Sequence, residues 1–158
     1  MSGDREEDEA QVAFEACLER SVHRVQSELG LGLTEAIYRN ALAIELRNYG
    51  HQVSMEVPVP VWFEEEVIGT IRADLVVTES MKHPHGTRVS RVIELKKAAK
   101  ITMAHATQAK AYLKRSPKGS TAHVINFGPE DVELQTIDQN CAERRKRARE
   151  EENHELVD

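Results

Sequence analysis

The sequence is poor in cysteine and has no long apolar run. Its 158 residues include two cysteines, Cys17 and Cys141, which lie far apart and outside any metal-ligand spacing. A cysteine-held zinc site is therefore excluded, and free thiols in a reducing compartment are expected. No stretch approaches the roughly 18 apolar residues that a membrane span needs, and no signal-peptide pattern opens the chain. We expect an intracellular protein, in the cytoplasm or the nucleus, without membrane contact.

The net charge of −6 argues at first sight against a nucleic-acid partner, but the charge is unevenly distributed. Residues 1–19 carry one basic and seven acidic side chains, and residues 129–158 carry five basic and ten acidic ones. Residues 20–128 carry fifteen basic and ten acidic side chains. The middle of the chain is therefore basic, and it becomes more so if some of its carboxylates bind a metal cation. This permits binding to a phosphate backbone.

Hydrophobic spacing predicts a mixed α/β domain. Apolar residues fall at helical intervals from about Val12 to Gly30 and again from Leu33 to Gly50, where Thr34 could cap the second helix. Period-two alternation then predicts a hairpin, whose prolines suit an edge strand. Further strands are expected over 91–96, 122–127 and 132–137, with a helix over 102–115. We divide the chain into an acidic, flexible start (1–10), a folded domain (11–137) and a charged tail (138–158).

Two neighbouring predicted strands carry acidic groups among apolar residues. In the first, Ala73, Leu75 and Val77 are expected to share a buried face, which places Asp74 on the opposite face. In the second, Glu94 and Lys96 are two residues apart and so share a face. Two carboxylates with a lysine beside them suit Mg²⁺ or Mn²⁺, hard cations that accept carboxylate and phosphate oxygens. Taken alone, the pattern is weak, and a structural ion-pair network is the favoured interpretation, by roughly two to one.

The helix expected over 102–115 carries a polar stripe. His105, Gln108 and Tyr112 are spaced three and four apart and lie on one helix face. The purely structural alternatives are that His105 caps the helix or is a core residue whose hydrogen bonds are formed, and that Tyr112 packs at the rim of the core. A polar stripe beside a carboxylate pair favours a functional site over these alternatives.

The segment Gly32-Leu33-Thr34-Glu35-Ala36-Ile37-Tyr38 resembles the signature of the GxxExxY proteins, a branch of the PD-(D/E)XK nuclease superfamily. The resemblance covers about Leu18 to Gly128. Its other landmarks follow in order: Ala41-Leu42, Glu45-Leu46, the hairpin, Arg72-Ala73-Asp74-Leu75, Ile93-Glu94-Leu95-Lys96, His105-x-x-Gln108-x-x-x-Tyr112 and Asn126-Phe127-Gly128.

The resemblance implies a restriction-endonuclease-like α/β fold with an α-β-β-β-α-β core, in which helices flank a mixed central sheet. It implies that Asp74 and Glu94 bind a Mg²⁺ or Mn²⁺ ion and that Lys96 is the catalytic lysine. Glu35 would add an acidic group from the first core helix, as a third metal ligand. Gln108 and Tyr112 resemble the Gln-x-x-x-Tyr motif of RecB-type nucleases. Nucleic-acid contacts are expected from Tyr38, Arg72, Lys97, Lys100 and His105.

The leading hypothesis is therefore a metal-dependent nuclease acting on DNA, with RNA as a further possible substrate and a homodimer or larger complex as a possible assembly. The alternative is a non-catalytic module that keeps the fold and binds nucleic acid or protein. The basic run Arg144–Arg149 is open to three interpretations: a solvated helix face, a nucleic-acid contact or a nuclear-localisation signal. His83 and His85 could touch a metal, although an exposed polar loop is the commoner setting for such residues.

Overall fold

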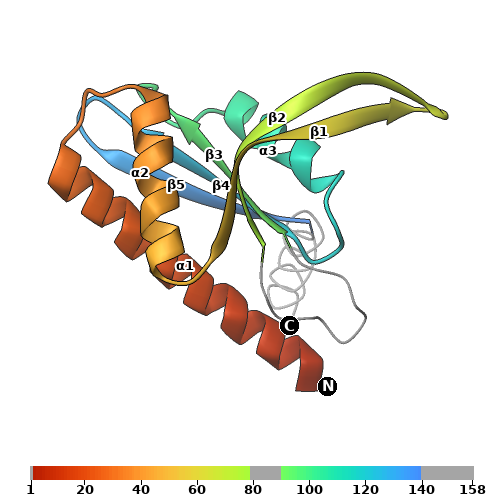
Figure 1. Ribbon diagram of the computed structural model, residues 1–158, viewed down its shortest axis with the longest axis horizontal. Coiled ribbons are helices and arrows are strands. Elements are labelled where there is room, and N and C mark those ends of the chain that lie inside the picture. Colours follow the sequence, from red (N-terminus) through yellow and green to blue (C-terminus); the bar gives the residue numbers. More distant parts are fainter. Residues whose placement is uncertain (1, 79–89, 140–158) are drawn as a thin grey trace, which may run out of the picture.

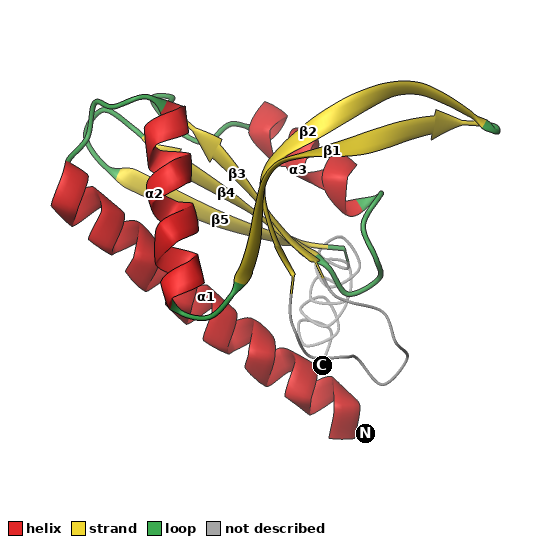
Figure 2. Cartoon of the chain, viewed as in Figure 1, coloured by secondary structure: helices red, strands yellow, loops and turns green. Residues whose placement is uncertain are grey.

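The computed structural model describes residues 2–78 and 90–139, with side chains from residue 9 onward, and contains three helices and five strands in that part of the chain (Figures 1 and 2). In chain order they are α1 (Ser2–Leu29), α2 (Glu35–Asn48), β1 (Gln52–Phe63), β2 (Glu66–Thr78), β3 (Ser90–Lys96), α3 (Met103–Leu113), β4 (Thr121–Phe127) and β5 (Val132–Asp138). This confirms the predicted order of elements. Within the described residues, no helix has the length and apolar character to cross a membrane.

The five strands form one mixed sheet in the order β1-β2-β3-β4-β5. β3 and β4 are parallel, and the other neighbours are antiparallel. Helices α1 and α2 cover one face of the sheet and α3 covers the other (Figure 1). β1 lies at an edge, which is where Pro58 and Pro60 are tolerated because they have no N–H to donate to a further strand.

The core has two layers, one on each face of the sheet. Ile93 and Leu95 of β3 pack with the apolar residues of α1 and α2. Val92, on the opposite face, packs with Ala109, Tyr112 and other residues of the α3 layer. Every residue of β4 is buried, as expected for a strand covered on both faces. The alternation of β3 therefore places Glu94 on the side of α3, the face that Val92 also occupies.

β2 leaves the sheet near Asp74. Its ladder with β3 runs from Leu75 opposite Ile93 to Thr78 opposite Ser90, and beyond it the β1–β2 hairpin curves away (Figure 1). Glu56, beside this point on β1, has a φ of 50°, a left-handed conformation that is costly for a residue with a side chain.

The bend at Asp74 corrects one expectation. Leu75 and Val77 pack in the α1–α2 layer, whereas Ala73 packs in the α3 layer. The prediction that all three share one face was wrong for Ala73, because the strand turns between it and Leu75.

One helix boundary and one expected capping bond also differ from expectation. α1 begins at Ser2 rather than near Val12, because Glu and Asp are tolerated in a helix and interact favourably with the dipole of its first turn. Thr34 does occupy the N-cap of α2, but its side chain makes no capping hydrogen bond. The expectations for His83, His85 and the run Arg144–Arg149 fall outside the described residues.

Candidate active site

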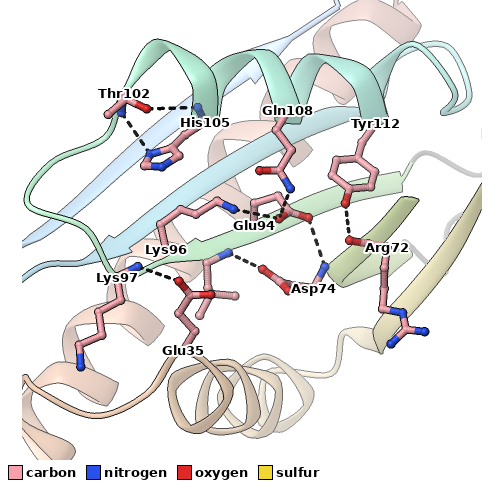
Figure 3. A network of polar contacts seen from close by, with 11 residues as sticks. Glu35, Arg72, Asp74, Glu94, Lys96, Lys97, Thr102, His105, Gln108 and Tyr112 are labelled. Atoms are coloured by element: carbon pink, nitrogen blue, oxygen red, sulfur yellow. Dashed lines mark hydrogen bonds and ion pairs between the residues drawn. The ribbon is translucent and has the colours of Figure 1, made fainter. Parts of the chain in front are cut away.

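Asp74 and Glu94 meet where the β2–β3 ladder ends. The Leu95 N–H donates to Oδ2 of Asp74 at 2.8 Å, and the Asp74 N–H donates to Oε1 of Glu94 at 3.3 Å. Each carboxylate is thus held by a backbone amide of the opposite strand (Figure 3). The predicted convergence of these two acids on one side of the sheet is what the fold produces.

The two carboxylates form an electrostatically unfavourable pair. Glu94 is 2% exposed, and this burial together with the charge of Asp74 raises the pKa of Glu94 to about 8. The Nζ atom of Lys96 lies 4.0 Å from Oε2 of Glu94 and acts in the opposite direction, favouring the ionised form. The one positive charge of Lys96 does not balance two adjacent carboxylates. A bound cation would therefore stabilise the pair.

α3 covers the pair with two polar side chains. Nε2 of Gln108 lies 3.5 Å from Oε2 of Glu94, and the hydroxyl of Tyr112 donates to the carbonyl oxygen of Arg72 (Figure 3). Burial and the nearby charge of Glu94 raise the pKa of Tyr112 to about 12, so its hydroxyl remains a donor at neutral pH. The expected Gln-x-x-x-Tyr pair is therefore beside the acids.

Glu35 lies in the first turn of α2, next to the end of β3. Its Oε1 accepts a hydrogen bond from the Lys97 N–H at 3.1 Å, and Nζ of Lys97 reaches the Gly32 carbonyl at 3.3 Å. In the described part of the chain, no three His, Cys, Asp or Glu residues are arranged as a ready metal cluster. The observed partner of Glu35 is thus the backbone that follows Lys96, and its metal role stays a prediction.

The sequence did not assign a role to Asn126, at the end of β4. This residue is fully buried and bonds Ala98 twice, accepting from its N–H at 2.8 Å and donating to its carbonyl at 2.9 Å. Gly128 packs so closely beside it that an added Cβ would lie 3.2 Å from the Ala98 carbonyl oxygen. Both residues fix the segment after Lys96. A polar residue near the end of a strand that is otherwise rich in apolar residues was the available signal.

Two expected nucleic-acid contacts have structural partners instead. Tyr38 has no exposed surface, stacks on Phe127 at a ring distance of 4.1 Å, and donates its hydroxyl to the Gly30 carbonyl at 2.7 Å. The prediction that Tyr38 contacts nucleic acid was wrong, because the side chain is part of the core. His105 forms a reciprocal capping box with Thr102, the role given above as its alternative.

Arg72, Lys97 and Lys100 are exposed, as a contact with phosphate requires.

The donor set fits a hard divalent cation. Asp74 and Glu94 offer carboxylate oxygens, the ligands that Mg²⁺ and Mn²⁺ prefer. The two carboxylates are close together, Glu94 is buried, and its pKa is raised. The site therefore lacks positive charge.

Fold and site together define an α/β protein with two acids and a lysine on adjacent strands of a mixed sheet. The model of the PD-(D/E)XK nuclease superfamily matches residues 13–137, and the chain belongs to that superfamily. Its mixed five-stranded sheet flanked by helices is the expected restriction-endonuclease-like fold, so the predicted fold class is confirmed.

The other comparisons are more distant. No curated protein matches the sequence significantly. A solved structure titled "Crystal structure of SSO0001" is similar at 18% identity and a TM-score of 0.43, over 77% of this chain and 62% of that one. The match thus spans less than two thirds of that protein's length.

Proposed function

We propose that this protein is a divalent-metal-dependent nuclease that hydrolyses phosphodiester bonds in DNA, and that it belongs to the GxxExxY branch of its superfamily. The observation that carries the proposal is the meeting of Asp74, Glu94 and Lys96 at the end of the β2–β3 ladder. Binding of phosphates alone would not favour two adjacent carboxylates, one of them buried.

Asp74 and Glu94 are the residues that would hold a Mg²⁺ or Mn²⁺ ion. When bound, such an ion supplies Lewis acidity and neutralises negative charge on a phosphodiester. Glu35 is a further acid, contributed by α2, and it would have to leave the Lys97 amide to take part directly. Its carboxylate is exposed, so this exchange requires no change in the core.

Lys96 supplies a positive charge beside the acids. Its ammonium group, 20% exposed and held near Glu94, can orient a water molecule toward the scissile phosphorus or stabilise the negative charge that develops in the transition state. Gln108 and Tyr112 hold Glu94 and the bend of β2 in place through their hydrogen bonds. Arg72, Lys97 and Lys100 are exposed cations available to the phosphate backbone.

The test is a cleavage assay with labelled single- and double-stranded DNA and RNA, in Mg²⁺ or Mn²⁺ and in EDTA. Wild-type protein should cut DNA only with metal. Glu94→Gln and Lys96→Met should lose cleavage, whereas Lys110→Met, at an exposed position on α3, should keep it. A wild-type protein that cuts none of these substrates, or variants at Glu94 and Lys96 that cut as fast as wild type, would refute the proposal. A pure binding module would instead retain DNA without metal and leave it intact.

A further inference from the structure

The far end of the β1–β2 hairpin is an apolar tip. The hairpin extends past the rest of the sheet (Figure 1), and its end exposes Trp62 (61%), Phe63 (65%), Val67 (49%) and Ile68 (64%). Successive strand residues point to opposite faces, so the tip has apolar surface on both faces. Large apolar side chains gathered on a projecting element mark a contact surface rather than scattered surface residues.

A second apolar patch lies at the base of the same hairpin, where α2 packs against β1. Ile37 (43%) and Ile44 (58%) lie seven residues apart on the outer stripe of α2, followed by Tyr49 (50%), and Met55 (41%) is exposed on β1. The tip and the base together contain eight of the twelve large apolar side chains that are exposed among the described residues. The β1–β2 hairpin connects the two patches.

The tip and the base carry charges of opposite sign. The turn of the hairpin contributes three exposed acids, Glu64, Glu65 and Glu66. At the base, Arg47 donates to the Val53 carbonyl at 2.9 Å, and Arg39 and Arg72 lie 3.3 and 3.9 Å from the single carboxylate of Glu56. Guanidinium groups therefore outnumber carboxylates at the base, while the tip is purely acidic.

We propose that the hairpin is a dimerisation arm, which pairs with the arm of a second copy of this chain across a two-fold axis so that each tip covers the base of the other. An arm with an acidic apolar end and a basic apolar end is complementary to itself when two copies run antiparallel. The seven residue-to-residue steps from Met55 to Trp62 span roughly 23 Å in each copy. Because the spacing is identical in the two copies, both contacts form at once.

Two features select this mode of association. Pro58 and Pro60 stand between the patches on the edge strand and have no N–H, so the arms meet through side chains rather than by extending the sheet. The three glutamates at the tip would repel a phosphate backbone, which disfavours nucleic acid as the occupant of this surface. The inference does not depend on the proposed reaction.

The mass of the full chain, measured by light scattering and sedimentation over a concentration series, tests the proposal. Wild type should be a dimer. Trp62→Gln at the tip and Ile44→Gln at the base should each raise the dimer dissociation constant about tenfold or more, since buried aromatic and aliphatic anchors dominate such contacts. Val12→Gln is the matched control, because Val12 is 65% exposed but belongs to neither patch. All three positions are at the surface, so the variants should fold.

Charge exchange tests which ends meet. Glu65→Arg and Arg47→Glu should each weaken the dimer, and the chain carrying both substitutions should recover much of the lost affinity. Spin labels on Pro58→Cys and Glu65→Cys, each made in a chain with Cys141→Ser, test the geometry. Labels at position 58, midway along the arm, should lie closer together across the dimer than labels at position 65.

Four results would overturn the inference. The first is a monomeric wild type at every concentration. The second is a dimer that resists both Trp62→Gln and Ile44→Gln, and the third is a shorter label distance at the tips than at mid-arm. The fourth is a Trp62→Gln variant that keeps the dimer but loses DNA affinity in Ca²⁺, which would assign the tip to nucleic acid.

Discussion

Glu94 should destabilise the metal-free fold, and the isosteric substitution Glu94→Gln measures this cost. The buried carboxyl has a pKa raised from 4.5 to about 8. The folded state therefore binds more protons than the unfolded chain between these values, and stability falls as the pH rises through that window. From pH 4.5 to neutrality is about 2.5 units, which at about 1.36 kcal/mol per unit gives roughly 3 kcal/mol. Glutamine carries no charge and keeps an oxygen to accept from the Asp74 amide.

The assay is urea and thermal unfolding in EDTA across the pH window. At neutral pH, Glu94→Gln should be more stable than wild type by up to about 3 kcal/mol, which corresponds to roughly 6–12 °C in Tm for a domain of this size. The difference should shrink as the pH falls toward 4.5 and vanish below it, where the wild-type carboxyl is protonated in both states. Added Mn²⁺ should raise the Tm of wild type more than that of the variant.

The control is Glu28→Gln, at an exposed position of α1, which should change stability by less than about 0.5 kcal/mol. A Glu94→Gln variant that is no more stable than wild type in EDTA at neutral pH would show that the acid pair is not under electrostatic strain. The argument for a cation at this site would then lose its physical basis.

Three further outcomes are expected. Lys96→Met should lower the cleavage rate by roughly 10²–10³-fold yet keep the metal-induced rise in Tm seen in wild type, which a thermal melt with and without Mn²⁺ checks. Asn126→Ala should cost roughly 2–4 kcal/mol in urea unfolding, because it leaves the N–H and the carbonyl of Ala98 without their partner. Burial and the charge of Arg91 lower the pKa of His123 from 6.5 to about 3, so only the unfolded chain binds a proton between these values and stability falls as the pH drops through that window. His123→Gln should reduce the loss of stability between pH 6.5 and 3, measured by urea unfolding. An unchanged pH dependence would contradict the lowered pKa of His123.

Local patterning accounts for what the sequence predicted well. Strong period-two alternation located the strands, and the spacing of Glu94 and Lys96 placed them on one face because a strand allows no other arrangement. The stripe of Gln108 and Tyr112 followed in the same way from the helical period. These features are set by residues close together in the chain, so no tertiary information was needed.

The features that escaped prediction depend on distant partners. The bend that turns Ala73 away from Leu75 depends on a left-handed Glu56, and such a conformation has no signature at a glutamate. Tyr38 looks like a surface tyrosine until Phe127, far along the chain, stacks on it. Glu35 meets the amide of Lys97 only because α2 lies beside the end of β3.

The end of the β2–β3 ladder explains why the acids are held so firmly despite their mutual repulsion. Where β2 bends away, the Leu95 amide has no strand carbonyl to pair with and takes the Asp74 carboxylate instead. The Asp74 amide likewise takes the Glu94 carboxylate. The side chains thus replace two backbone partners that the bend removes, because a buried amide left unpaired is costly. The bend thus leaves free the amide donors that orient the carboxylates toward one another, and the geometry of the site follows from the point at which β2 separates from β3.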